Sequence, residues 1–154
     1  LLEELDRRGV RRADVVLHVG AGTFKPVETD DPAFHTMHEE RYRIPEDTAR
    51  AVTDAKAAGH RVWAVGTTSV RTLEAAADES GTVRPGTGET RIFIRPPARP
   101  RVVDALITNF HLPRSTLIML VASFLGYELT MRAYHAAIAE RYRFYSYGDA
   151  MAIV

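Results

Sequence analysis

The stretch RVWAVGTTSVRTLEAAA, residues 61–77, contains a complete pattern of strand, turn and helix. Its first five residues form a short, mostly apolar run, which is typical of a buried strand. The polar turn at 66–69 follows, and the residues up to about Ala77 predict a helix. This segment therefore indicates a strand–helix unit of an α/β protein.

Similar patterns flank this unit. Strands are predicted at 14–19, 92–94, 102–108 and 144–154, and helices at 1–9, 45–58, 115–125 and 128–141. We expect an α/β fold with a mostly parallel or mixed sheet flanked by helices, in a single domain over residues 1–154.

Composition restricts the protein class. The chain has 154 residues, 45% of them hydrophobic, with 20 basic and 20 acidic residues and no cysteine. It can form one core, and its zero net charge argues against wholesale non-specific nucleic-acid binding. The absence of cysteine excludes disulfides and thiolate metal sites, which permits an intracellular location. The longest apolar run, 117–125, is too short for a membrane span, and the start at Leu1 without Met predicts a fragment of a longer chain.

Three strands end in polar turns, at 18–24, 66–71 and 108–111. If these strands are parallel neighbours, the turns form one site, because ligands bind at the carboxyl ends of such strands. Gly20 and Gly22 either bring backbone N–H groups close to a ligand or provide positive φ angles. A dinucleotide fingerprint is rejected, because its third glycine and its helix are missing.

The turn before the 67–77 helix favours an anion, since helix N-termini present free N–H groups. Arg71, one turn into the helix, would clamp a carboxylate or phosphate. The alternative is an ordinary helix cap with a solvated arginine.

The segment at 35–40 combines two histidines with two glutamates. His35 and His38 precede Glu39 and Glu40, but two histidines without thiolates are weak evidence for zinc, and no metal site is predicted. This segment is either a polar surface loop or a source of proton-transfer groups. His111 is singled out because its turn joins a buried strand to a capped helix.

Between Arg84 and Arg101, five arginines accompany one acid, Glu89. Guanidinium groups on this proline-broken ribbon would contact phosphates, although a solvated face explains them nearly as well. The predicted RNA-binding residues are Arg91, Arg95, Arg99 and Arg101.

Five longer motifs carry a family resemblance. They are LHVGAGTFKPV (17–27), MHEERY (37–42), AVGTTSVRTLE (64–74), DALITNFHLPRSTLIMLV (104–121) and YRFYSYGDAM (142–151). Together they resemble the S-adenosylmethionine:tRNA ribosyltransferase-isomerase family of queuosine biosynthesis. The resemblance covers the C-terminal half of the family's full-length chain, without its N-terminal half and small β-rich domain, and implies part of a larger barrel-like α/β domain.

The resemblance implies a cytoplasmic enzyme that moves the ribosyl group of S-adenosylmethionine onto 7-aminomethyl-7-deazaguanine at the tRNA wobble position. The product is epoxyqueuosine, and adenine and methionine leave. No cofactor is required, S-adenosylmethionine is a co-substrate, and a monomer is favoured. The alternative is a non-catalytic anion- or RNA-binding module, or an inactive fragment.

The resemblance also suggests roles for individual residues. Glu40 and His38 are candidates for the base at ribose C5′, and His111 or Asp104 for the acid that assists adenine departure. The substrate-binding candidates are Gly20, Gly22, Thr23, Phe24, Gly66, Thr67, Thr68, Ser69, Arg71 and Asn109.

Overall fold

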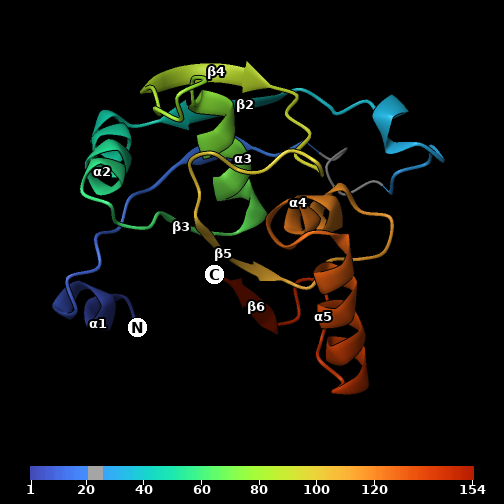
Figure 1. Cartoon of the computed structure of the whole chain (residues 1–154). Coiled ribbons are helices and arrows are strands. Elements are labelled where there is room, and N and C mark those ends of the chain that lie inside the picture. Colours follow the sequence, from blue (N-terminus) through green and yellow to red (C-terminus); the bar gives the residue numbers. More distant parts are fainter. Residues whose placement is uncertain (21–25) are drawn as a thin grey trace.

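Helix α3 (Thr67–Ala76) lies at the centre of the molecule, between two small sheets, as the computed structural model in Figure 1 shows. The structure describes residues 1–20 and 26–154. Seven of the ten α3 residues are buried, and the helix contacts strands of both sheets. A helix covered on two sides must be largely apolar, so its buried Arg71 and Glu74 are unusual.

The first sheet is entirely antiparallel, in the order β1-β2-β4. Its strands are β1 (Val16–His18), β2 (Glu40–Ile44) and β4 (Gly86–Thr90). Arg41 and Arg43 of β2 are exposed, whereas Glu40 and Ile44 are buried against the interior. This alternation is typical of a sheet with one wet face.

The second sheet has the order β3-β5-β6. Its strands are β3 (Trp63–Val65), β5 (Ala105–Asn109) and β6 (Ala150–Ile153). β3 and β5 are parallel, and β6 is antiparallel to β5. The α/β class and the mixed sheet are therefore confirmed, and a mostly parallel sheet is wrong, because β3–β5 is the one parallel pair in the described part of the chain.

The other helices surround this centre. They are α1 (Leu2–Arg7), the short 3-10 helix η2 (Pro32–Phe34), α2 (Glu46–Ala57), α4 (Thr116–Leu125) and α5 (Tyr127–Ala139). The Ser115 hydroxyl caps α4 by accepting the Leu117 N–H, and Gly126 ends that helix with a φ of +77°. Within the described ranges no single helix is long and apolar enough to cross a membrane; α4 and α5 pass that test only as a pair, bent by 115°.

One predicted strand is wrong. Residues 92–94 form no strand, and β4 forms upstream at 86–90, where Gly88 pairs with Tyr42 of β2. A Cβ at position 88 would lie 2.7 Å from Cζ of Tyr42, so the tyrosine ring occupies the space that glycine leaves. The pairing of β4 with β2 depends on residues that are distant in sequence, so local strand propensity does not predict it.

Candidate functional site

A buried ion pair joins three of the sequence motifs. Nη1 of Arg71 in α3 lies 2.5 Å from Oε2 of Glu40, and the two side chains are 4% and 0% exposed. The other carboxylate oxygen, Oε1, accepts a hydrogen bond of 3.0 Å from the N–H of Gly20. Gly20, the start of β2 and the central helix therefore meet at one carboxylate.

The positions of Glu40 and Arg71 in their elements explain why the two side chains pair. Glu40 is the first β2 residue on the face that α3 covers, and Arg71 lies one turn into α3. Each charge would be expensive to bury alone, so the pair offsets much of that cost. The anion that engages Arg71 in this structure is an internal carboxylate, which differs from the predicted role as a clamp for a ligand.

Arg71 also lines a small cavity beside the start of α4. The cavity has a volume of about 10 Å³ and includes Met37, Phe93 and Thr116 in its wall. The Thr116 hydroxyl is buried and has no hydrogen-bond partner within residues 1–20 and 26–154. This volume is close to the minimum for a single water molecule. In this conformation the cavity is therefore too small for a nucleoside.

The turn before α3 meets the carboxyl end of β5. Gly66 has a φ of +84°, and its N–H donates to the Ile107 carbonyl at 2.8 Å. Thr67 is buried and Thr68 is exposed, while the Ser69 hydroxyl donates to the Val65 carbonyl at 2.8 Å. The helix has no side-chain cap, so the capping interpretation is wrong for these hydroxyls.

The asparagine–histidine turn lies at this same end of β5. Asn109 is exposed, and its side-chain amide donates to the Asp149 carbonyl at 3.2 Å. Further along this loop, the Arg114 carbonyl accepts the Val27 N–H at 2.7 Å. The loop after β5 thus contacts the segment that follows the glycine turn. Gly22, Thr23 and Phe24, predicted to frame the nucleoside, lie outside the described residues.

His111 is part of the interior. Its ring Nε2 lies 2.9 Å from the Thr108 hydroxyl, and its backbone N–H donates to the Tyr134 hydroxyl at 3.0 Å. Burial lowers the pKa of His111 to about 4 and raises the pKa of Tyr134 to about 12. Near pH 7 the ring is therefore the neutral imidazole and not the imidazolium, and neutral imidazole is a poor acid for departing adenine.

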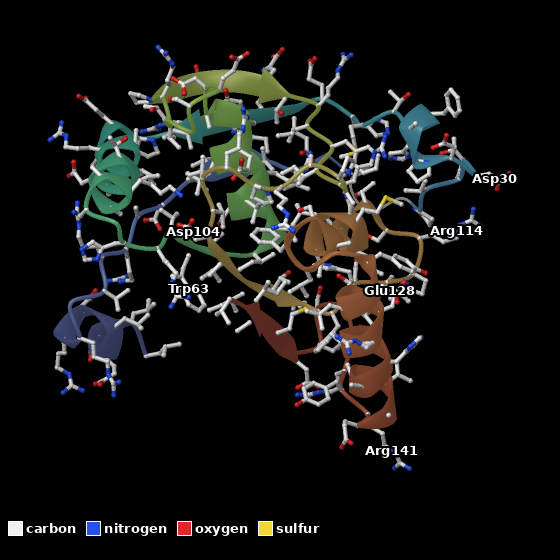
Figure 2. All side chains as sticks on the ribbon, viewed as in Figure 1. Asp30, Trp63, Asp104, Arg114, Glu128 and Arg141 are labelled. Carbon is white, nitrogen blue, oxygen red and sulfur yellow. The ribbon has the colours of Figure 1, made fainter. Side chains whose placement is uncertain are left out.

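Asp104 lies at the opposite end of β5. One of its carboxylate oxygens pairs with Nζ of Lys56 at 3.0 Å, and the other accepts the Val62 N–H at 2.8 Å. Asp104 therefore joins the amino ends of β3 and β5, and the structure does not bring it together with the other candidates. Figure 2 labels Asp104 and Arg114 on opposite sides of the molecule.

His38 is exposed just before β2, and the adjacent Glu39 pairs with Arg91 at 3.1 Å. His38 thus lies two residues from Glu40 in sequence but outside the buried ion pair. No group of three or more His, Asp or Glu side chains that could hold a metal ion occurs in the described part of the chain.

The arginine ribbon is mostly solvated. Arg91, Arg99 and Arg101 are exposed, and Arg95 stacks over the Phe93 ring at 5.5 Å. These residues belong to the segment of chain that connects β4 to β5. Their exposure fits both phosphate contacts and a simple solvated face.

Sequence reasoning missed Glu74. This buried carboxylate of α3 accepts the backbone N–H groups of Arg101, Val102 and Val103 at 2.9, 2.9 and 3.1 Å. It fixes the end of the arginine ribbon to the central helix. A glutamate one helical turn after Arg71 was the available signal, but its backbone partners are 27 to 29 residues away.

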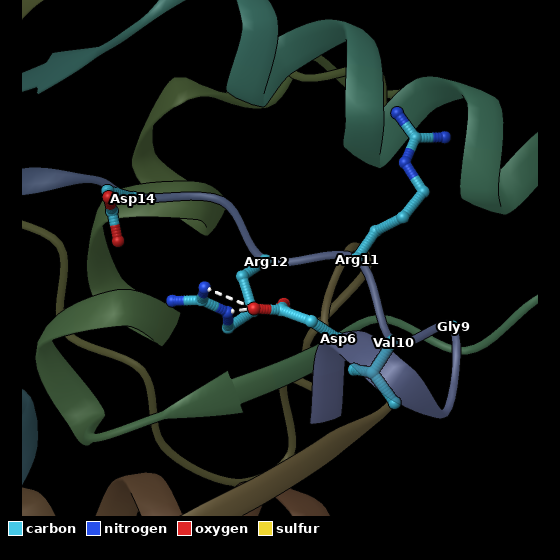
Figure 3. A pocket seen from close by; sticks show the side chains of 6 residues that line it. All are labelled: Asp6, Gly9, Val10, Arg11, Arg12 and Asp14. Carbon is cyan, nitrogen blue, oxygen red and sulfur yellow. Dashed lines mark hydrogen bonds and ion pairs between the residues drawn. The ribbon is translucent and has the colours of Figure 1, made fainter. Parts of the chain in front are cut away.

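A second hollow lies at the N-terminal end of the chain. Figure 3 shows it next to α1, lined by Asp6, Gly9, Val10, Arg11, Arg12 and Asp14. Arg12 pairs there with Asp6 at 2.9 Å. None of the predicted site residues lines this hollow, so it is not assigned to the site.

Comparisons with known proteins identify relatives. The family described as "Queuosine biosynthesis protein" matches residues 1–153. The chain is 62% identical, over 154 residues, to a protein of Thermus thermophilus named S-adenosylmethionine:tRNA ribosyltransferase-isomerase. It is 56% identical to a protein of the same name from Symbiobacterium thermophilum. All of this chain is covered, against 44% and 45% of those two relatives, so it spans less than half their length.

A solved structure also matches this chain in fold and sequence. The crystal structure of an S-adenosylmethionine tRNA ribosyltransferase from Thermotoga maritima matches with a TM-score of 0.79 at 45% identity. The match covers 99% of this chain and 48% of that one.

Proposed function

Because this chain belongs to the queuosine biosynthesis protein family, we propose that it supplies part of an S-adenosylmethionine:tRNA ribosyltransferase-isomerase. The reaction would transfer the ribosyl group to 7-aminomethyl-7-deazaguanine at the tRNA wobble position, form epoxyqueuosine, and release adenine and methionine. A cytoplasmic location belongs to the same proposal, because the substrate would be a tRNA.

The observation that carries this proposal is the meeting of three family motifs at one buried carboxylate. Glu40 of MHEERY engages both Arg71 of AVGTTSVRTLE and Gly20 of LHVGAGTFKPV. A fold alone does not define a function, but residues from distant motifs that converge on one buried interaction indicate a built site.

The geometry assigns Glu40 a positioning role better than the role of base. Both of its oxygens are engaged, and its side chain is fully buried. A base must come within hydrogen-bond reach of the proton it removes. His38, which is exposed, remains the candidate base at ribose C5′. Neither His111 nor Asp104 suits the acid role, so that role is unassigned among the described residues.

Substrate contacts are proposed at the end of the second sheet where β3 and β5 finish. Backbone N–H groups at the start of α3 would donate to the methionine carboxylate or an RNA phosphate, and Asn109 would bind a base edge. The exposed arginines 91, 99 and 101 would contact tRNA phosphates.

The test is a chimera in which this chain replaces the matching 44% of the Thermus thermophilus relative. Given S-adenosylmethionine and tRNA that carries the aminomethyl base, the chimera should release adenine in step with a mass increase of the tRNA. A folded chimera that binds tRNA and releases no adenine would contradict the proposal and would favour a binding module.

A further inference from the structure

The segment that connects α5 to β6 (Figure 1), residues 140–149, contains four aromatic residues, and core packing accounts for only some of them. Phe144 packs inside, where its ring centroid lies 5.3 Å from that of Phe110 and 5.8 Å from that of Tyr134. Tyr147, by contrast, is 75% exposed. The interior therefore explains the phenylalanine of this segment but not this tyrosine.

The backbone of the segment is strained at its centre. Tyr145, which is 39% exposed, has a φ of +66°, a left-handed conformation that bulky residues rarely adopt. Such a conformation persists only where the surrounding structure enforces it, and it occurs most often at functional sites. Here the Tyr145 N–H donates to the Phe110 carbonyl at 2.7 Å, and the Arg143 N–H donates to the Asp149 carboxylate at 2.5 Å. These hydrogen bonds hold the segment in a defined conformation.

The same contacts bring the segment to the carboxyl end of β5. Phe110 directly follows Asn109, and the Asn109 side-chain amide donates to the Asp149 carbonyl at 3.2 Å. Tyr145 and Tyr147 therefore belong to a segment that is bonded to the residue proposed to bind a base edge. Proteins recognise unpaired RNA bases by hydrogen bonds to base edges combined with stacking on aromatic rings. An exposed tyrosine in a segment bonded to an asparagine provides both.

Charge and exposure narrow the class of ligand. Residues 140–149 contain two basic and two acidic residues, and Arg143 pairs with Asp149 at 3.3 Å, so the segment presents rings rather than net positive charge. Paired RNA keeps its base faces inside the helix, where a tyrosine does not reach them. Pockets for small molecules enclose most of the ligand surface, whereas the Tyr147 ring is mostly in solvent. An unpaired base within a longer RNA fits these observations best.

We propose that Tyr147, together with Tyr145, forms a stacking surface for an unpaired base of the RNA substrate. This inference rests on the proposed function, which supplies the identity of the RNA, and it adds the side chains that would hold a base beside Asn109. Its test measures RNA binding, whereas the proposed function is tested by adenine release, so the two can fail separately.

The test uses the full-length chimera and a fluorescent RNA hairpin copied from the anticodon arm of a tRNA. A blunt duplex of the hairpin stem is the comparison ligand, because it lacks unpaired bases. The variants are Tyr147→Ala, Tyr147→Phe and the matched control Tyr127→Ala, which removes a tyrosine that is 66% exposed on α5. Fluorescence anisotropy gives the Kd of each protein for both RNAs at low and high salt.

We expect Tyr147→Ala to raise the Kd for the hairpin at least about fivefold, because the loss of one aromatic stacking partner has effects of this size. Tyr147→Phe keeps the ring and should bind like the unsubstituted chimera, as should Tyr127→Ala. The ratio of Kd values should be the same at both salt concentrations, since stacking releases no counterions. Duplex binding should be equal in all variants.

Equal hairpin affinities of the Tyr147→Ala variant and the unsubstituted chimera would overturn the proposal, and so would the absence of hairpin binding by the unsubstituted chimera. An equal loss of hairpin and duplex binding would also overturn it, because a stacking surface acts on unpaired bases. A Tyr147→Ala variant that loses affinity for S-adenosylmethionine but not for the hairpin would identify adenine as the ligand instead.

Photo-crosslinking provides a second measurement that does not depend on a substitution. 5-Iodouridine is placed in turn at each loop position of the hairpin, and the crosslinked peptides of the unsubstituted chimera are mapped. We expect at least one loop position to crosslink to Tyr145 or Tyr147. Crosslinks confined to other parts of the chimera would contradict the stacking surface.

Discussion

Glu40 and Glu89 lie on neighbouring strands but in opposite environments, and each pairs with an arginine. The Glu40–Arg71 pair is buried, whereas the Glu89–Arg41 pair is 49% and 79% exposed. The free energy contributed by an ion pair depends on this difference. Removing one partner of a buried pair leaves an uncompensated charge, while exposed pairs contribute little.

Glu40→Ala is therefore expected to lower the free energy of unfolding by about 3–5 kcal/mol. Glu89→Ala, its matched control, should lower it by less than about 1 kcal/mol. Urea unfolding of the isolated chain measures both values. Similar effects of the two substitutions would show that the buried pair does not contribute more to stability than the exposed one.

His111 predicts a pH dependence of stability. Because burial lowers its pKa from 6.5 to about 4, the folded protein binds fewer protons than the unfolded chain between these values. The stabilisation is fully present above pH 6.5 and is lost as the pH falls towards 4, with a total of about 3 kcal/mol. His111→Asn should flatten this part of the stability profile. His135→Asn, at an exposed position on α5, should leave the profile unchanged; an unchanged profile in His111→Asn would contradict the assignment.

At the scale of elements, helices were more predictable than strands. The 66–69 turn, Ser115 and Gly126 mark helix ends through local backbone chemistry, and α3, α4 and α5 begin within about a residue of the predicted positions. The local sequence does not determine whether a strand pairs in parallel or antiparallel fashion. β1 pairs with β2 and β5 pairs with β6 in antiparallel fashion, and the 92–94 run forms no strand, because partners distant in sequence determine the pairing.

Ser115 allows a test of how much a helix cap contributes to the stability of the protein. Its hydroxyl accepts the Leu117 N–H at 3.1 Å, so Ser115→Ala should lower the free energy of unfolding by about 1 kcal/mol. Ser146→Ala, at an exposed position between α5 and β6, is the control and should change little. Chemical denaturation compares them. A Ser115→Ala variant as stable as the Ser146→Ala variant would show that the cap does not stabilise α4.

Glu74 tests a non-local connection between elements. Glu74→Ala leaves the N–H groups of Arg101, Val102 and Val103 without their acceptor. Each unsatisfied buried donor costs about 1–3 kcal/mol, and the N–H groups of Val102 and Val103 are buried, so we expect a loss of at least about 2 kcal/mol. Glu79→Ala, at an exposed position after α3, is the control. Thermal unfolding measures both, and equal midpoints would contradict the anchoring role.

At the scale of the whole molecule, the sequence correctly indicated an α/β fold and the family, and it placed Gly20, Glu40 and Arg71 among the site candidates. It did not show that these residues engage one another, because a sequence does not reveal which acid lies within reach of a buried arginine. It also did not show that Asp104 lies at the far end of β5 or that the His111 ring is buried. Both residues lie at the ends of β5, and their buried or paired states follow from tertiary packing.

We propose, centrally, that the Glu40–Arg71 pair organises the site of the proposed ribosyl transfer. The most direct measurement is the rate of adenine release by the chimera that carries Glu40→Gln together with Arg71→Gln, which removes both charges and leaves neither one buried alone. We expect a folded protein whose rate of adenine release is lower by about 100-fold, because small misplacements of site residues have effects of this size. A folded double variant that releases adenine at the rate of the unsubstituted chimera would contradict it.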